Sequence, residues 1–272
     1  MKNFEDKVVV ITGTGSGIGR ALALEFKKLG AKLAINDYNE VALLETLDLL
    51  GGPANAFYQA FNVADKTAFY KFAEDVVAHY GRVDVVINNA GVAIFKLTAS
   101  EISTADYEWI FGINLWGMMH GSLAFLPHLR EQQESSLVNV SSIFGIIGFP
   151  HQAAYCTTKF AIRGFTETLA LEERVLKTGV TVTSVHPGGI KTNIARNARY
   201  AEMDEIATEQ FEKSFITTPE KAAQTIIRGI RLKKTRVLVG RDAKLLYFLT
   251  KLSPKFVAWY LIRFANQFNK AD

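Results

Sequence analysis

Cysteine and histidine are scarce in this sequence, and their scarcity narrows the classes of protein to consider. Cys156 is the single cysteine among 272 residues, which excludes an internal disulfide. The five histidines form no cluster with it, so we expect no metal site. Apolar runs are short: the run at 256–262 has seven residues, whereas a membrane-spanning helix needs ~20. We therefore expect neither a disulfide-rich secreted protein, nor a zinc protein, nor a membrane-spanning one.

Acidic residues are few in the C-terminal part, so the charge is unevenly distributed. Residues 228–272 contain eleven lysines and arginines against two aspartates, and residues 1–227 carry a net charge of −5. The basic residues of that part alternate with bulky aliphatic ones, so we expect no nucleic-acid partner. Residues 1–7 carry charges on both sides of Phe4 and do not resemble a signal peptide, which favours a cytoplasmic protein.

Short apolar runs rich in valine and isoleucine alternate along the chain with amphipathic stretches. Such runs are typical of parallel strands that are covered on both faces by helices. The pattern predicts a doubly wound α/β fold. The predicted strands are residues 7–12, 32–37, 57–63, 83–88, 136–141, 180–186 and 236–239, and the predicted helices are 20–29, 41–50, 67–80, 105–126, 153–177 and 219–232.

A glycine-rich turn follows the first predicted strand directly and leads into a helix. Its spacing is Gly13-x-x-x-Gly17-x-Gly19, with Ser16 and Ile18 between the glycines. Glycines allow a tight turn and close approach of a ligand, and the amides at a helix start attract a pyrophosphate. The turn therefore predicts a dinucleotide site.

Asp37 ends the second predicted strand, eighteen residues beyond Gly19. An acidic side chain there can accept hydrogen bonds from the adenosine ribose and repels a 2′-phosphate, so we expect NAD, with NADP as the alternative. Asp37 can also cap the helix that follows. Position 14 is Thr, and Arg20 is the one cation that could reverse the preference.

Tyr155 and Lys159 lie four positions apart on a predicted helix and therefore share a face. An ammonium beside a phenol favours the phenolate, so we expect Lys159 to lower the pKa of Tyr155 toward neutral. Ser142 precedes the tyrosine by thirteen positions. Alone, the Tyr-x-x-x-Lys spacing is common on ordinary amphipathic helices.

Together these motifs resemble the short-chain dehydrogenase/reductase family. The resemblance rests on residues 12–19, Asn88-Asn89-Ala90-Gly91, Asn114, Ser142, Tyr155, Lys159, and Pro187-Gly188 followed by Thr192. It implies a seven-stranded parallel sheet in the order 3-2-1-4-5-6-7 and one domain, residues 1–240, that holds both cofactor and substrate. It also implies a homodimer or homotetramer formed through the helices that carry Asn114 and Tyr155.

The resemblance also assigns a catalytic role to four residues. Tyr155 would exchange a proton with the substrate oxygen, and Lys159 would bind the nicotinamide ribose. Ser142 would hydrogen-bond the substrate oxygen, and Asn114 would bind a water that links Lys159 to solvent.

Further residues would bind the cofactor. The turn of Asn89, Ala90 and Gly91 would pass beside the adenosine ribose, and Asn62 and Val63 would lie beside the adenine, although the family usually has Asp-Val there. The residues expected at the nicotinamide are Tyr155, Lys159, Pro187, Gly188, Ile190 and Thr192.

Other conspicuous residues have plainer interpretations. His186 is expected to make a structural hydrogen bond. Phe144, Phe149 and Phe160 line a substrate pocket in one interpretation and pack on the core in the other. Residues 193–218, which include Tyr200, Met203, Phe211 and Phe215, would form a lid over an apolar substrate.

The C-terminal residues 241–272 form a basic, aromatic extension. Leu245, Phe248, Leu249 and Leu252 fall on one helical stripe, and Ser253-Pro254 interrupts the pattern before the apolar run at 256–262. Two interpretations stay open. The extension packs over the substrate pocket or a partner subunit, or it lies on an anionic membrane surface as a peripheral contact.

The favoured function is an NAD-dependent oxidoreductase that transfers hydride between nicotinamide and an alcohol or carbonyl of a hydrophobic substrate. One alternative is an NADPH-dependent carbonyl or β-ketoacyl reductase. Another is a cofactor-binding sensor without turnover, although such a sensor has no need of Asn114, Ser142, Tyr155 and Lys159 together.

Overall fold

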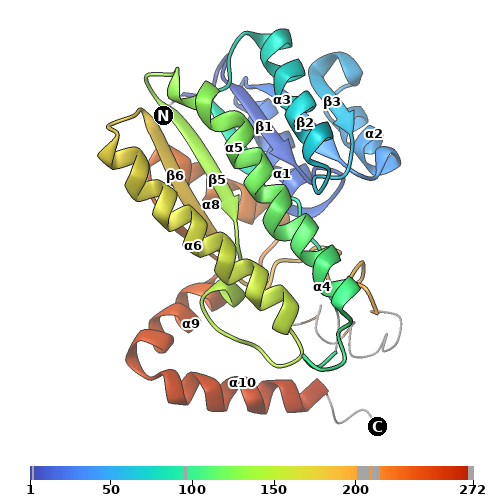
Figure 1. Ribbon diagram of the computed structural model, residues 1–272, viewed down its shortest axis with the longest axis vertical. Coiled ribbons are helices and arrows are strands. Elements are labelled where there is room, and N and C mark those ends of the chain that lie inside the picture. The colour runs from blue at the N-terminus through green and yellow to red at the C-terminus, as the bar shows by residue number, and fades with distance from the viewer. Residues whose placement is uncertain (2, 95–96, 201–208, 210–212, 214, 269–272) are drawn as a thin grey trace.

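The protein contains a seven-stranded parallel sheet with the strand order β3-β2-β1-β4-β5-β6-β7 (Figure 1). This confirms the predicted fold. The computed structural model describes residues 1–272 except 2, 95–96, 201–208, 210–212, 214 and 269–272. The strands are β1 (Val8–Thr12), β2 (Lys32–Asp37), β3 (Ala56–Ala60), β4 (Val85–Asn88), β5 (Ser135–Val140), β6 (Val180–Pro187) and β7 (Arg236–Val239).

The strand predictions are correct in number and order, and the largest error lies at β3. The predicted strand runs to Val63, but β3 ends at Ala60, and Asn62 turns the chain by accepting a hydrogen bond from the amide of Ala64 at 3.0 Å. Polar side chains that bond the backbone locally compete with strand pairing. Asn62 and Val63 therefore lie in the loop beyond the strand rather than in it.

Two layers of helices cover the sheet. Helices α1, α2 and α8 contribute to one hydrophobic core, and α3, α5 and α6 contribute to the other. Successive side chains of a strand point to opposite faces, so Val9 and Ile11 of β1 enter the first core while Val8 and Val10 enter the second. The helices are α1 (Gly17–Lys28), α2 (Glu40–Leu49), α3 (Lys66–Tyr80), α4 (Thr104–Phe111), α5 (Gly117–Arg130), α6 (Ala153–Val175), α8 (Pro219–Arg231), α9 (Arg241–Leu252) and α10 (Pro254–Phe268), with short helices η1 (Pro53–Asn55) and η3 (Ile143–Gly145).

The stretch predicted as one helix over 105–126 is interrupted in the structure. A π-helical turn, η2 (Gly112–Trp116), joins α4 to α5 and carries the buried Asn114. A π turn accommodates one more residue than an α turn and often occurs at functional sites. Hydrophobic periodicity indicates the long helix but does not reveal this irregularity.

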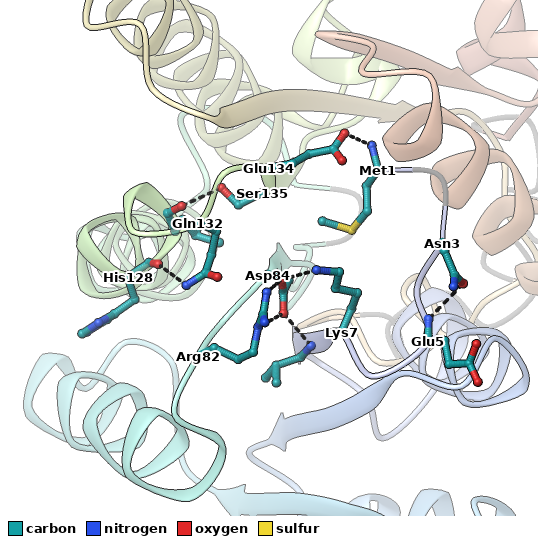
Figure 2. A network of polar contacts seen from close by, with 12 residues as sticks. Met1, Asn3, Glu5, Lys7, Arg82, Asp84, His128, Gln132, Glu134 and Ser135 are labelled. Carbon is teal, nitrogen blue, oxygen red and sulfur yellow. Dashed lines mark hydrogen bonds and ion pairs between the residues drawn. The ribbon is translucent and has the colours of Figure 1, made fainter.

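A polar network closes the amino ends of β1 and β4 (Figure 2). Asp84 is fully buried, accepts from the backbone amide of Val8 at 3.0 Å and pairs with Lys7 at 3.1 Å and with Arg82 Nε at 2.9 Å. The N-terminal amine of Met1 pairs with Glu134 beside it. This network ties the amino ends of these strands together, at the ends away from the glycine turn.

Helices α9 and α10 lie along one end of the molecule, outside the two layers (Figure 1). Ala243, Val257 and Leu261 from these helices share a small core with Ile143 and Ile147. The inner face of the extension therefore packs on the loop that follows Ser142. Among the described residues, no helix is long and apolar enough to span a membrane.

Candidate active site

The glycine turn has the backbone shape that only glycine adopts easily. Gly13 and Gly17 have φ angles of +70° and +54°. A Cβ on Gly13 would lie 2.8 Å from the Cα of Ala90, and one on Gly19 would lie 2.0 Å from the carbonyl oxygen of Gly13. Side chains at Gly13 and Gly19 would therefore clash with neighbouring backbone. Without side chains, the backbone of the turn can be approached closely by the predicted dinucleotide.

Thr12 holds the loop after β4 against this turn. Its hydroxyl accepts hydrogen bonds from the backbone amides of Asn89 and Ala90, each at 3.1 Å. The side-chain amide of Asn89 donates back to the carbonyls of Thr12 and Gly13 at 3.0 and 3.1 Å. Thr12 was part of the predicted motif, but no role was predicted for its hydroxyl. The only indication of that role in the sequence is that β1 ends with a hydroxyl-bearing residue.

The Asp37 carboxylate lies at the glycine turn and is already hydrogen-bonded to backbone. It accepts from the amides of Gly15 at 2.8 Å and Asn39 at 3.0 Å. A Cβ on Gly15 would lie 2.9 Å from this carboxylate, so glycine is needed there for the contact. The structure thus brings the predicted ribose-binding residue to the glycine turn, and Asn39, not Asp37, caps α2 through the amide of Ala42.

Arg20 lies at the same turn and is engaged through its Nε and one of its two terminal nitrogens. Its guanidinium donates to the carbonyls of Gly15 and Ala42, to the Glu45 carboxylate at 2.9 Å and to the Thr46 hydroxyl at 2.9 Å. These acceptors neutralise and orient the one cation that could have favoured a 2′-phosphate.

The predicted nicotinamide turn follows β6 and lies against the glycine turn. The methyl group of Thr192 would be 3.0 Å from a Cβ on Gly17, and Ile190 is buried beside Thr217. The amide of Gly188 donates to the carbonyl of Val239 at 2.9 Å. Thr192 thus brings the turn that follows Pro187 against Gly17 of the glycine turn.

Asp242 supports this turn and was not predicted. It begins α9, and its carboxylate accepts from the amide of Gly189 at 2.6 Å. A Cβ on Gly188 would lie 2.1 Å from this carboxylate. Asp242 is more than fifty positions from the turn in sequence, and no local pattern connects the two.

Ser142 lies just beyond β5 and is held by a buried histidine. His186 is fully buried; its Nδ1 lies 3.0 Å from the carbonyl oxygen of Ser142 and its Nε2 lies 2.9 Å from Ser184 Oγ. Burial lowers the pKa of His186 to about 4, so the ring is neutral at pH 7. The predicted structural role of His186 is confirmed, and its partner is the backbone of a catalytic candidate.

Tyr155 and Lys159 lie on α6 as predicted, facing Ser142. The Lys159 ammonium is 5.4 Å from the centre of the Tyr155 ring and donates to the carbonyl of Val140 at 3.0 Å. Ser142 hydrogen-bonds the Tyr155 hydroxyl. The neighbouring Ser141 is structural, because its hydroxyl donates to the carbonyl of Lys159 at 2.7 Å.

The predicted lowering of the tyrosine pKa is wrong for the protein without cofactor. Burial raises the pKa of Tyr155 to about 12, although the hydrogen bond with Ser142 opposes the rise. Burial also lowers the pKa of Lys159 to about 8. Desolvation disfavours the phenolate of Tyr155 and the ammonium of Lys159. The Lys159 ammonium, which is hydrogen-bonded to the carbonyl of Val140, does not outweigh the effect of desolvation on Tyr155.

Asn114 reaches the same site through the π turn. Its side chain accepts from the amide of Val92 at 2.8 Å and donates to the Val92 carbonyl at 2.9 Å and to the Thr158 hydroxyl at 3.2 Å. Gly91 lies beside it: a Cβ there would be 3.3 Å from Asn114 Oδ1 and 3.4 Å from Lys159 Nζ. Thr158, one position before Lys159, was not predicted as a partner.

The remaining cofactor candidates lie at the start of α1 and in the loop after β3. Ser16 precedes α1 and is exposed, whereas Ile18 packs on the core. Val63 is buried against α5, where a Cβ on Gly117 would touch it. Asn62 uses its oxygen on Ala64 and keeps its amide NH₂ for another partner.

Aromatic side chains connect the tyrosine with the C-terminal extension. Phe144 lies edge-on to Tyr155 with ring centres 6.4 Å apart and stacks on Phe149 at 4.9 Å. Phe149 in turn contacts Phe264 of α10 at 6.2 Å. Phe144 and Phe149 therefore both pack on the extension, and Phe144 also flanks the tyrosine, whereas Phe160 is exposed on α6.

The start of the predicted lid is anchored to α4. Asp106 accepts from the Tyr200 hydroxyl at 2.8 Å and pairs with Arg199, whose guanidinium lies 3.8 Å from the centre of the Trp109 ring. Phe215 is buried near Gly189. Met203 and Phe211 lie outside the described residues.

Comparison with known proteins agrees with this geometry. Residues 7–203 match the family model described as short chain dehydrogenase. The chain belongs to the short-chain dehydrogenase family. Tyr155, Lys159, Ser142 and Asn114 are thus brought together in the setting that the family resemblance implied, and the protein is a dehydrogenase or reductase of this type.

Several known proteins are similar over most of the chain. The oxidoreductase SadH of Mycobacterium tuberculosis is 43% identical over 258 residues, covering 93% of this chain and 92% of SadH. The 3-oxoacyl-[acyl-carrier-protein] reductase FabG of Thermotoga maritima is 34% identical, covering 82% of this chain and 89% of FabG. The crystal structure of a short chain dehydrogenase/reductase from Burkholderia phymatum in complex with NAD has a TM-score of 0.84 at 27% identity, covering 93% of this chain and 96% of that one.

Proposed function

We propose that this protein is an NAD(H)-dependent oxidoreductase that acts on an alcohol or carbonyl group of a hydrophobic substrate, with Tyr155 as the general acid and base. The observation that carries the proposal is the convergence of Tyr155, Lys159, Ser142 and Asn114 beside the glycine turn. A protein that only senses a dinucleotide has no use for a buried phenol hydrogen-bonded to a serine.

Each residue supports a defined part of the reaction. Tyr155 gives its proton to the substrate oxygen during reduction and takes it back during oxidation. Ser142 donates a hydrogen bond to the same oxygen and stabilises charge that develops there. Lys159 would bind the ribose of the nicotinamide nucleotide, and Asn114 would hold the route by which Lys159 exchanges protons with solvent.

When bound, the nicotinamide supplies or accepts the hydride, and its oxidised form adds a positive charge to the site. The groups that would hold the dinucleotide are the glycine turn, Asp37, Asn62, the loop at Asn89–Gly91 and the turn from Pro187 to Thr192. A positive charge near Tyr155 opposes the effect of burial and brings the pKa of the phenol down toward the working range.

The preference for NAD over NADP rests on Asp37 and Arg20. The carboxylate at the turn repels a 2′-phosphate, and Arg20 is committed to Gly15, Ala42, Glu45 and Thr46. The Burkholderia relative was crystallised with NAD, which supports the same choice. A hydrophobic substrate is supported by the apolar side chains around Tyr155, including Phe144 and Ile94.

The test compares the parent protein with Tyr155→Phe. Fluorescence titration should show tight NADH binding by both and weaker NADPH binding. A panel of aliphatic and cyclic alcohols with NAD should then give turnover that falls at least ~100-fold in the variant, because general acid–base catalysis contributes 10²–10⁴-fold. Turnover by Tyr155→Phe equal to that of the parent would contradict the assigned role, and NADH binding without any turnover would favour the sensor.

We further propose a homodimer or homotetramer formed through α4, α5 and α6. Apolar side chains project from the outer surfaces of the π turn, α5 and α6. They are Trp116, Leu123, Phe160 and Leu171, exposed by 53%, 46%, 42% and 62%. An isologous contact between copies would cover these faces.

A further inference from the structure

The C-terminal helices α9 and α10 present two different faces. Their inner face is buried: Ala243, Val257 and Leu261 pack on Ile143 and Ile147, next to the active site. This contact fixes how the two helices are rotated about their axes. It therefore decides which of their side chains point outward.

The outer face is apolar and exposed on both helices. It carries Leu245, Phe248 and Leu252 of α9 and Phe256, Trp259, Tyr260 and Ile262 of α10, each between 45% and 65% exposed. The residues of α9 follow the spacing i, i+3, i+7, and Phe256, Trp259 and Tyr260 of α10 follow the spacing i, i+3, i+4, so each helix carries an apolar stripe. Exposed apolar stripes of this kind mark an interaction site.

The charges that α9 and α10 carry after Asp242 are all positive. Lys244, Lys251, Lys255 and Arg263 flank the apolar stripe, and the sequence contains no aspartate or glutamate from position 243 to position 271. Arg263 lies over the Trp259 ring at 5.4 Å, and Lys251 over the Tyr247 ring at 4.7 Å. Two copies of the chain meeting at this face would bring like charges together, whereas an anionic surface would be attracted to it.

The geometry favours contact in the plane of a membrane. Helices of twelve and fifteen residues are shorter than the ~20 residues that span a bilayer, and Ser253-Pro254 separates them. An amphipathic helix with lysine and arginine beside tryptophan, phenylalanine and leucine lies in the headgroup region. Because the inner face is already packed, this contact needs no unfolding of the extension.

We propose that α9 and α10 dock the protein on the surface of an anionic lipid bilayer, with Phe248, Leu252, Phe256 and Trp259 inserted among the acyl chains and the flanking lysines on the headgroups. This proposal is independent of the catalytic one. It explains why the basic charge of the chain is concentrated in its last part.

The test measures sedimentation of the full-length protein with vesicles. Vesicles of phosphatidylcholine with 30% phosphatidylglycerol would be compared with vesicles of pure phosphatidylcholine, at low salt and in 0.5 M NaCl. Salt screens the attraction between the lysines and the anionic headgroups, because the Debye length falls from about 10 Å at 0.1 M to about 3 Å at 1 M. We expect at least tenfold stronger partitioning on the anionic vesicles, reduced by salt. Lys244→Glu/Lys255→Glu should lose about tenfold or more in partitioning, since each cation near an anionic surface adds to the attraction and each glutamate opposes it.

The decisive variant is Phe248→Ser/Trp259→Ser, with Val41→Ser/Leu49→Ser as its matched control. Val41 and Leu49 lie on α2 and are exposed by 70% and 58%, against 58% and 54% for Phe248 and Trp259. The first variant should lose at least tenfold in partitioning, and the control should match the parent. Unchanged NADH binding and thermal unfolding would show that both variants are folded.

Two results would overturn the proposal. One is equal sedimentation of the parent and Phe248→Ser/Trp259→Ser with anionic vesicles. The other is a parent protein that forms a larger assembly than this variant in light scattering and does not sediment with vesicles, which would show that a second copy covers the face.

Discussion

At the scale of single residues, burial controls the chemistry of this site more than the neighbouring charges do. Tyr155, Lys159 and His186 all have a pKa displaced toward the neutral form, and desolvation is the first cause for each. The protein without cofactor is therefore held with a protonated phenol and a neutral imidazole at pH 7. Lys159, whose pKa of about 8 lies above 7, keeps its positive charge at pH 7.

His186 gives a prediction about acid stability. Its pKa is about 4 in the folded protein, below the ~6.5 of an unfolded histidine, so the unfolded chain takes up a proton first as the pH falls. Stability should therefore decrease between about pH 6.5 and pH 4, by about 3 kcal/mol from this group. Urea unfolding of His186→Asn should show a smaller loss than the parent over this window.

The control for this experiment is His128→Asn, which removes a partly exposed histidine of α5 and should follow the parent. An unfolding free energy of His186→Asn that runs parallel to that of the parent from pH 7 to pH 4 would contradict the argument.

Single residues also show where sequence reasoning ends. Tyr155, Lys159, Ser142 and Asn114 were identified because they belong to motifs with fixed order and spacing. Asp242 was not identified, because it contacts Gly189 across the fold. Thr158, which bonds Asn114, was not identified because it is one threonine among several on α6. The direction of the tyrosine pKa was mistaken because desolvation depends on what surrounds a side chain, which spacing does not give.

At the scale of elements, the glycine turn depends on both its backbone shape and its neighbours. Gly13 and Gly81 have the same φ angle of +70°, but a Cβ on Gly13 would meet Ala90 at 2.8 Å, whereas one on Gly81 would meet nothing within 4 Å. A substitution at Gly81 would therefore show the effect of backbone strain alone, whereas one at Gly13 would show strain and steric contact together. Thr12 prevents the loop at Ala90 from moving away.

This contrast predicts different outcomes for Gly13→Ala and Gly81→Ala. Both substitutions place a side chain in the left-handed region, at a cost of about 1–2 kcal/mol. Only Gly13→Ala should also weaken NADH binding, by at least tenfold, because its methyl group displaces backbone at the turn. Urea unfolding and NADH titration measure the two effects; equal NADH affinity in both variants would show that the turn is not the cofactor site.

Most elements were predictable because each strand is a nearly continuous apolar run buried between two layers. β2 and β7 have the predicted bounds; β2 itself begins at Lys32 and ends at Asp37, and β7 is followed by Gly240. The strand predicted at β3 was too long because Phe61 and Val63 are apolar and buried or half-buried without being in the sheet.

The division of the chain into a domain of residues 1–240 and a C-terminal extension stays a prediction.

At the scale of the whole molecule, the outer surfaces of α5 and α6 lie in one layer and are the basis of the proposed assembly (Figure 1). Light scattering should give the mass of a dimer or tetramer for the parent. Leu123→Asp/Leu171→Asp should shift it toward the monomer, since like charges would face each other across an isologous contact. Val41→Asp on α2 is the control, being 70% exposed on the other layer. A monomeric parent protein would disprove the assembly.

The π turn between α4 and α5 has a consequence for how this site can change over time. Asn114, which bonds Val92 and Thr158, lies within the π turn Gly112–Trp116, where the helix gains one residue. Removing one residue from that turn would keep every catalytic side chain in the sequence and yet rotate one side of the helix by about 100° relative to the other. The site therefore depends on the length of this helix as well as on its residues, and a descendant with such a deletion would retain the motifs while losing the arrangement.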